Sequence, residues 1–308
     1  MATATFKAQT KTTEKTKANK MVQLDKILVA TDFSPASMRA LDYALALARR
    51  YESYLHVAHV ISADAYPMVA PEVAVDSVNR QHREAEEKFR ELEFAEKFGS
   101  VKHEAHIEEG ALWPAIEGLV DAYGIDLVVV GTRGVGRVQK VIIGSGAEQI
   151  FRQSKQPVLT IGPAVENGAA SEPAFQNILF ATDFGLGAER EAAYAFSLGQ
   201  ENNARVTLLH VMRHLEDYSE DGITLKKEAI RTELQELVPQ GGDFWCHVDL
   251  RMEVGDPGEL SLAVAAEMHA DLIVMGAKKR SGLAGHVPGT LAYKIVTDAR
   301  CPVLTIRS

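Results

Sequence analysis

Cysteine is scarce in this 308-residue sequence, and long apolar runs and an excess of basic charge are missing. The two cysteines, Cys246 and Cys301, are too few for a disulfide scaffold, so a reducing cytoplasmic location is expected. No apolar run approaches the roughly 18 residues that a membrane-spanning helix needs. The formal net charge of −9 argues against nucleic acid or an anionic membrane as a partner, because both require a large basic surface.

Two common phosphate-binding signatures are also absent. A Walker loop needs Gly-Lys-Ser/Thr, but Lys140 stands between Gln139 and Val141. A dinucleotide fingerprint that begins at Gly134 or Gly144 would need a glycine or alanine five residues later, and both positions hold glutamine. Any phosphate site in this chain must therefore be of another type.

What the sequence does contain is the composition of an ordinary globular protein, with 46% hydrophobic and 24% charged residues. Its length predicts two domains, each large enough to bury a core. A Thr- and Lys-rich tail is expected to be disordered, because it has too little apolar surface to bury. The predicted segments are the tail at 1–22, a first domain at 23–163, a linker of small, turn-forming residues at 164–175 and a second domain at 176–308.

Short apolar runs alternate with segments of helical spacing, which is typical of a parallel sheet with helices on both faces. In the first domain, strands are expected at 26–30, 55–60, about 101–107, 127–130 and 157–161, and helices from 35, through 81–98, near 112–123 and from 147. The second domain repeats this order. Ala-Thr-Asp-Phe at 30–33 recurs at 181–184, and Pro-Val-Leu-Thr-Ile at 157–161 recurs at 302–306. We predict two repeated, doubly wound α/β domains, each with a five-stranded parallel sheet.

The glycine-rich stretch after the fourth strand of the first domain is the expected ligand site. The apolar strand ends at Gly131, Gly134 follows, and Gly144 and Ser145 open a helical segment, which gives the spacing G-x2-G-x9-G-[S/T]. Glycines between a strand and a helix let backbone N–H groups approach an anion, and the helix N-terminus adds unpaired donors and partial positive charge. A phosphate group is the expected ligand.

Three strand ends are expected to meet at this site. Asp32 follows the first strand, Val60 ends the second and Gly131 ends the fourth, and open α/β sheets bind ligands at the carboxyl ends of their strands. Asp32 either accepts hydrogen bonds from ribose hydroxyls or serves as a turn or helix-cap aspartate. Its recurrence as Asp183 favours a role in the shared design.

The glycine spacing, the Ala-Thr-Asp-Phe turn, the His-Val that ends the second strand and the terminal Pro-Val-Leu-Thr-Ile together resemble the universal stress protein family. The resemblance covers both repeats, nearly everything from residue 25 onward. It implies a tandem member with an adenine nucleotide α-hydrolase-like fold that binds ATP, with Mg²⁺ as a companion that phosphates recruit. It also implies that the aspartate holds the ribose, that the residue after the strand-two histidine meets adenine through its backbone, and that the glycine loop holds the phosphates.

Carried onto this sequence, the nucleotide-binding candidates are Thr31, Asp32, Val60, Gly131, Arg133, Gly134, Gly144, Ser145 and Gly146. Arg133 either neutralises phosphate charge or is solvated. The corresponding candidates of the second copy are Asp183, Val211, Gly276, Gly289 and Thr290. Lys279 replaces the second loop glycine there, and Pro288 removes an N–H donor, so we expect the second site to bind nucleotide more weakly or not at all.

Neither a metal site nor a catalytic centre is predicted. The pairs His56 with His59 and His103 with His106 are each separated by three residues on expected strands, so their side chains point to opposite faces. The related ATP pyrophosphatases and α-hydrolases carry a Ser-Gly-Gly-x-Asp-Ser loop after the first strand, whereas this chain has Thr-Asp-Phe-Ser. No Ser/His/Asp or paired-carboxylate spacing is evident either.

We therefore expect a non-enzymatic, ATP-binding regulatory protein of the stress response. The resemblance suggests that the two domains pair through their last strands as an intramolecular pseudo-dimer. The alternatives are a slow ATPase and a nucleotide-free interaction or scaffold protein. Further homodimerisation and an unidentified protein partner stay open.

Overall fold

The computed structural model describes residues 22–62, 71–132, 144–165, 175–213, 219–240, 245–277 and 291–307. The predicted tail, apart from its last residue, and most of the predicted linker lie outside these ranges. Among the described residues, no helix combines the length and the apolar character that crossing a bilayer requires.

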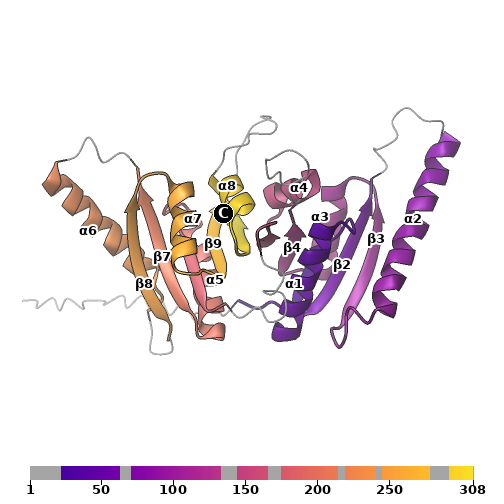
Figure 1. Cartoon of the computed structure of the whole chain (residues 1–308), viewed down its shortest axis with the longest axis horizontal. Coiled ribbons are helices and arrows are strands. Elements are labelled where there is room, and N and C mark those ends of the chain that lie inside the picture. Colours follow the sequence, from indigo (N-terminus) through magenta and orange to yellow (C-terminus); the bar gives the residue numbers. More distant parts are fainter. Residues whose placement is uncertain are drawn as a thin grey trace, which may run out of the picture.

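Both halves of the chain alternate strands with helices, as the sequence predicts (Figure 1). The first half contains β1 (Lys26–Ala30), α1 (Pro35–Tyr51), β2 (Tyr54–Ile61), α2 (Pro71–Phe94), β3 (His103–Glu109), α3 (Leu112–Tyr123), β4 (Leu127–Gly131), α4 (Ser145–Gln153) and β5 (Val158–Ile161). The second half contains β6 (Asn177–Ala181), α5 (Ala188–Asn202), β7 (Arg205–Met212), α6 (Glu220–Leu237), β8 (His247–Val254), α7 (Pro257–Glu267), β9 (Leu272–Ala277), α8 (Leu291–Asp298) and β10 (Val303–Arg307).

The strands of both halves form one ten-stranded sheet in the order β3-β2-β1-β4-β5-β10-β9-β6-β7-β8. Within each half the strands are parallel, which confirms the predicted α/β class. The halves join through β5 and β10, which run antiparallel with Leu304 opposite Leu159. Pairing through the last strands, as the resemblance implies, is therefore present within the single chain.

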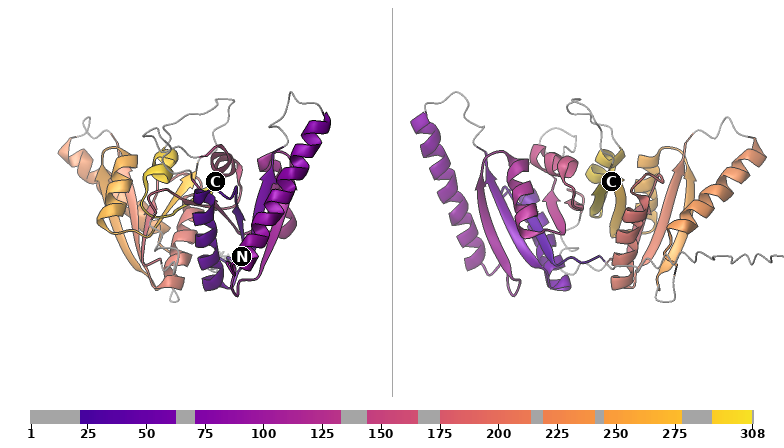
Figure 2. Two further views of the ribbon diagram at one scale, coloured as in Figure 1. Left: turned by 45° about the vertical axis from the view of Figure 1, so that its right-hand side comes forward. Right: turned by 180° about the vertical axis from the view of Figure 1, so that it is seen from behind.

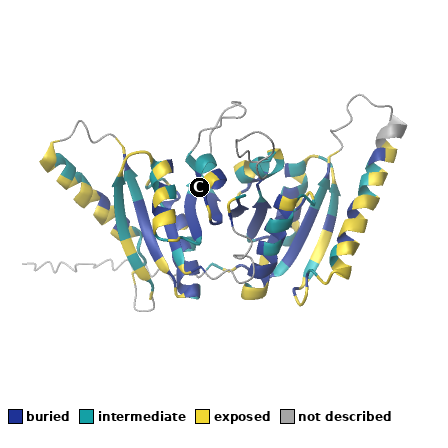
Figure 3. Cartoon of the chain, viewed as in Figure 1, coloured by how far each residue is buried: buried dark blue, intermediate teal, exposed yellow. Residues whose placement is uncertain are grey.

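Helices cover both faces of the sheet (Figure 2). On one face, α1, α2, α5 and α6 enclose a core that runs without a break through both halves and includes Leu41, Leu159, Phe180, Phe196 and Leu304. On the other face, α3 and α4 cover the first half, and α7 and α8 cover the second. Phe151 of α4 packs against the core of the second half on that face. The most deeply buried positions follow the central strands, while α2 and α6 at the two outer ends carry long exposed stripes (Figure 3).

Both predicted boundaries of the charged helix are wrong. The sequence interpretation places this helix at 81–98, but α2 begins at Pro71 and ends at Phe94. A proline is tolerated at the first position of a helix, because the N–H that it lacks would have no partner there. Glu96 adopts a left-handed φ of 51°, and its N–H bonds to the carbonyl of Glu93 while the N–H of Lys97 bonds to that of Leu92. These two bonds form a Schellman motif, which satisfies the last carbonyls of the helix. Glycine usually occupies the left-handed position, so a glutamate there gives no clear stop signal in the sequence.

Candidate functional site

A cleft of about 420 Å³ opens at the carboxyl ends of β1 and β4, where the strand order of the first half reverses. This volume lies within the roughly 300–1,000 Å³ typical of small-molecule sites. We call it the β1–β4 cleft. Its described lining includes Thr31, Asp32, Ser34, Ser37, Ala58, Val60, Leu112, Gly131, Gly144, Ser145 and Gly146. Every described candidate of the first domain therefore lines one cavity, and Arg133 and Gly134 lie outside the described residues.

Asp32 is held by the first turn of α1. Its Oδ1 atom accepts hydrogen bonds from the Ser34 backbone N–H at 3.0 Å and from the Ser37 hydroxyl at 2.8 Å. Ser34 also caps α1, because its side chain accepts the Ser37 N–H, and Pro35 begins the helix. Asp32 is therefore both a turn residue that contacts the start of α1 and a residue that lines the cleft.

These hydrogen bonds also set the charge of Asp32. Partial burial acts to raise the pKa of the carboxyl, but the hydrogen bonds from Ser34 and Ser37 outweigh it and hold the pKa below its usual value. The group is therefore ionised at neutral pH. An ionised carboxylate accepts about four hydrogen bonds, so Asp32 keeps capacity to accept bonds from ligand hydroxyls.

A residue of β2 supports the turn between β1 and α1. Phe33 has a left-handed φ of 58°, and its N–H bonds to the hydroxyl of Thr31. The carbonyl of Thr31 lies 2.9 Å from Nδ1 of His59, whose ring packs against Phe33 at 4.9 Å between centroids. His59 is thus a supporting residue that holds the Asp32 turn in place. The sequence signal for it was the His-Val repeat, which recurs as His210 with the same contact to Thr182.

The opposite wall of the cleft is the N-terminus of α4. Gly144 is the N-cap residue and has no side chain, so among the described residues the N-cap position leaves the first backbone N–H groups of the helix without a side-chain cap. Gly146 lies close to α3, because a Cβ on it would lie 2.9 Å from Cδ2 of Leu112. The open helix N-terminus is suited to an anion. Ala58, Val60 and Leu112 give the cleft an apolar portion as well.

Gly131 has a packing role that the sequence interpretation missed. A Cβ on this residue would lie 2.2 Å from the carbonyl oxygen of Ala36 and 2.6 Å from its carbonyl carbon. Both atoms belong to the backbone of α1, so the end of β4 and the start of α1 are in contact. The glycine is therefore required by the fold, whatever the cleft binds.

Comparison with known proteins identifies the family. The sequence model described as the universal stress protein family matches residues 23–162 and 174–307. The chain belongs to the universal stress protein family.

Its relatives are tandem and single-domain universal stress proteins. One from Mycolicibacterium smegmatis is 26% identical over 293 residues, which cover 91% of this chain and 96% of that protein. One from Thermus aquaticus is 30% identical over 138 residues, covering 43% of this chain and 99% of that protein. The crystal structure of a universal stress protein from Archaeoglobus fulgidus superposes with a TM-score of 0.67 at 22% identity, covering 92% of this chain and 99% of that one, which supports the tandem fold.

The second half of this tandem universal stress protein departs from the first at the corresponding site. Gly185 still donates its N–H to Asp183 at 3.0 Å, but Ala188 stands where Ser37 lies in the first domain. Glu191 replaces the buried Ala40, and it is itself only 5% exposed. Its Oε1 lies 2.2 Å from the position of a Cβ on Gly276, the counterpart of Gly131. A carboxylate therefore lies beside the end of β9, whereas the equivalent helix position of the first domain, Ala40, carries only a methyl group.

The other second-copy candidates are only partly described. Val211 lies in β7 and Gly276 in β9, at the ends that correspond to Val60 and Gly131. Gly289 and Thr290 lie outside the described residues, as do Lys279 and Pro288. The sequence analysis placed the difference between the two domains in the glycine loop. The structure adds a second difference in α5, and aligning the two repeats, which pairs Ala40 with Glu191, could have found it.

The structure also brings together two histidines from the pairs considered in the sequence analysis. His56 and His59 face opposite sides of the sheet, as do His103 and His106, because His59 contacts Phe33 and His103 contacts Phe98, while the other two contact Tyr123. Across the strands, however, Nδ1 of His56 lies 2.9 Å from Nε2 of His106. The sequence does not specify the register of β2 against β3, so this pair could not be predicted.

Proposed function

We propose that the first domain binds ATP in the β1–β4 cleft and that the chain acts as a nucleotide-dependent regulatory protein. The observation that carries this proposal is that Asp32, whose pKa is lowered, and the N-terminus of α4 line one cavity. Asp32 would accept hydrogen bonds from the ribose, and α4 would hold the phosphates. The apolar portion beside Val60 would take the adenine. Membership of the family supports this assignment.

Binding rather than hydrolysis is the activity we propose. Of the described residues that line the cleft, Asp32 is the one with an ionisable side chain, and two hydrogen bonds hold it at the α1 end. A hydrolase needs a group that positions or deprotonates the attacking water near the phosphates. Phosphate release that continues after one turnover, and stops in Asp32→Ala, would instead favour the slow ATPase.

The second domain is proposed to bind ATP more weakly or not at all. The side chain of Glu191 lies against Gly276, the counterpart of the cleft residue Gly131, and Ala188 cannot donate a hydrogen bond to Asp183 as Ser37 does to Asp32. The first difference changes the strand end that a ligand would approach, and the second leaves Asp183 with one fewer hydrogen bond to orient it toward a ribose.

Asp32→Ala is expected to weaken ATP binding at least about tenfold, because a hydrogen bond to a charged group contributes about 1.5–3 kcal/mol. Isothermal titration of the full chain, with and without Mg²⁺, measures this and is expected to give one ATP per wild-type chain. Asp183→Ala is the matched control in the second domain and should leave the affinity unchanged. Melting temperatures of both variants confirm that they fold.

Two outcomes would contradict the proposal. Two equal ATP sites per chain would show that the second domain is intact, and unchanged affinity in Asp32→Ala would remove the aspartate from the site. Native mass spectrometry of freshly purified protein adds a direct test. Bound ATP, ADP or AMP supports the assignment, whereas no bound nucleotide and no thermal shift with ATP would favour a nucleotide-free interaction module.

A further inference from the structure

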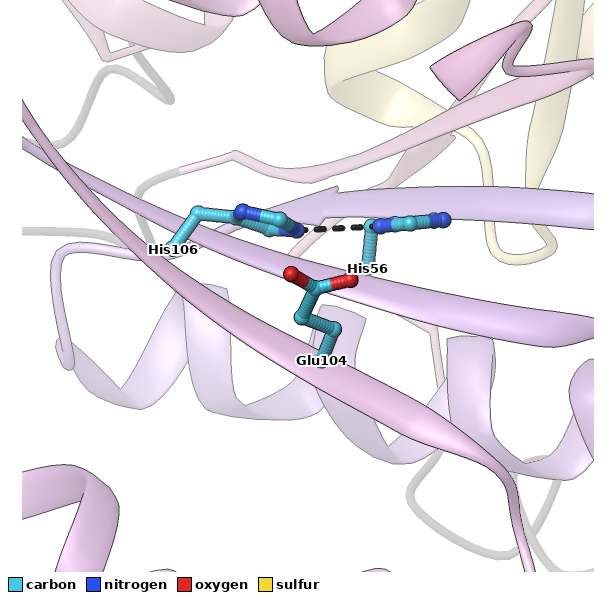
Figure 4. A group of neighbouring side chains, drawn as sticks. All are labelled: His56, Glu104 and His106. Atoms are coloured by element: carbon cyan, nitrogen blue, oxygen red, sulfur yellow. Dashed lines mark hydrogen bonds between the residues drawn. The ribbon is translucent and has the colours of Figure 1, made fainter. Parts of the chain in front are cut away.

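Three side chains that could coordinate a metal ion lie together on the face of the sheet that α3 covers. They belong to β2 and to the neighbouring edge strand, β3. His56 comes from β2, and Glu104 and His106 come from β3. Glu104 is the register partner of His56, and His106 is the partner of Ala58, so all three point to the same face. Figure 4 shows the carboxylate of Glu104 directed toward the gap between the two rings. We call these residues the His56/Glu104/His106 cluster.

We propose that the His56/Glu104/His106 cluster binds a divalent transition metal ion of the zinc class. One nitrogen from each ring and one carboxylate oxygen lie within 4.8 Å of one another. Tetrahedral zinc, with bonds of about 2.0–2.2 Å, places its ligand atoms about 3.3 Å apart. The present separation of 2.9 Å between Nδ1 of His56 and Nε2 of His106 needs only a small opening of the two rings.

The donor set fits zinc and leaves one position open. Two imidazoles with one carboxylate form a three-ligand set that zinc proteins use, and a water molecule then completes the tetrahedron. Soft thiolates are not involved, and a hard ion such as Mg²⁺ or Ca²⁺ would prefer oxygen ligands throughout. The ring that now donates the hydrogen bond between the histidines would move its proton to its other nitrogen, because both facing nitrogens must offer lone pairs.

The surroundings favour a cation. The charged groups that act on the two histidines are Glu104, Glu108 and Lys26, so acidic charge exceeds basic charge. Glu104 is exposed although both rings are buried, so the cluster lies where the core meets solvent. Burial lowers the pKa of both histidines, which agrees with neutral rings at neutral pH.

The fold itself does not require this cluster. In the second domain, the strand positions that correspond to His56, Glu104 and His106 are occupied by Thr207, Asp249 and Arg251. Arg251 forms ion pairs with Glu253 and Glu267 at 2.7 Å instead. The same arrangement of strands therefore forms without imidazoles, so the packing of the sheet does not by itself require histidine at these positions. This comparison also supplies replacements that the fold accepts.

The test uses the full chain, freed of metal by a chelator and without nucleotide, in isothermal titration with ZnCl₂. The wild type is expected to bind one Zn²⁺ at this site and to melt at a higher temperature when zinc is present. His56→Thr and His106→Arg, which install the residues of the second domain, are expected to weaken zinc binding at least tenfold and to lose the thermal shift. Glu108 can pair with the arginine of H106R as Glu253 pairs with Arg251, so this variant is expected to fold.

His82→Gln is the matched control, because His82 is a partly exposed histidine whose Nδ1 lies 3.4 Å from the carboxylate of Glu86. This variant should keep the wild-type zinc affinity. Co²⁺ in place of zinc should give the visible absorption of a four-coordinate ion in the wild type but not in H106R. The proposal is overturned if the wild type binds no zinc, or if H56T and H106R bind it as tightly as the wild type. ATP binding, measured on the same variants, is expected to be unchanged.

Discussion

Gly131→Ala is expected to lower the free energy of unfolding by about 3 kcal/mol, the upper end of the usual range for overpacking. The added Cβ would lie 2.2 Å from the Ala36 carbonyl oxygen, so the backbone of α1 or of β4 has to move. Gly276→Ala is the matched variant in the second domain, and about 1 kcal/mol is expected there. In that case the clashing atoms are the end of the Glu191 side chain and not a backbone segment. Urea unfolding followed by circular dichroism compares the two.

Equal destabilisation by the two alanines would contradict this account, because it would mean that the contact of β4 with α1 is no more rigid than a side-chain contact.

The prediction also affects how nucleotide-binding data on Gly131 variants are interpreted. A Gly131 variant that fails to bind ATP does not identify a nucleotide contact, since the variant disturbs the α1 turn that carries Asp32. Substitution of Asp32 is the cleaner test of the cleft.

Leu304→Ala is expected to lower the free energy of unfolding by about 2–5 kcal/mol and to shift the unfolding of both domains. Leu304 lies in β10, is 3% exposed and belongs to the core that also contains Leu159 and Leu41 of the first domain. Because this core continues across the β5–β10 join, loss of its methyl groups leaves a cavity that both domains line. The two halves should therefore unfold together.

Tryptophan fluorescence makes this test specific to one domain. The chain has two tryptophans, of which Trp113 is buried in the first domain and Trp245 is 57% exposed in the second. In a Trp245→Phe background, Trp113 alone reports the first domain, and its midpoint should shift with Leu304→Ala. Leu225→Ala, at a position in α6 that is 67% exposed, should leave the midpoint unchanged. If the midpoint reported by Trp113 does not change in Leu304→Ala, the two domains unfold independently.

The fold could be predicted from the sequence because each of its signals is local or repeated. Buried parallel strands appear as continuous apolar runs, and Ser34 with Pro35 marks the start of α1. The duplicated Ala-Thr-Asp-Phe segment defines the repeat. The helix end at Phe94 was missed because the left-handed residue that stops it is Glu96 and not glycine.

The candidate site was predictable only in part. Its described residues could be named because strand ends of a parallel sheet converge on one edge, which places Asp32, Val60 and Gly131 together without knowledge of side-chain positions. Contacts between elements could not be derived in this way. The approach of Gly131 to Ala36 depends on how β4 packs against α1, and the meeting of His56 with His106 depends on strand register. Neither is encoded in spacing along the chain.

The antiparallel join of β5 with β10 has a consequence for how the two halves can differ. When a symmetric dimer assembles from two copies of one chain, any substitution appears in both subunits. Here the partner is covalently attached and always present in equal amount, so Glu191 occurs in one half while Ala40 is retained in the other. The two halves can therefore carry different side chains at equivalent positions of the same sheet. A dimer of identical chains has the same side chain at both of these positions, whereas this chain does not.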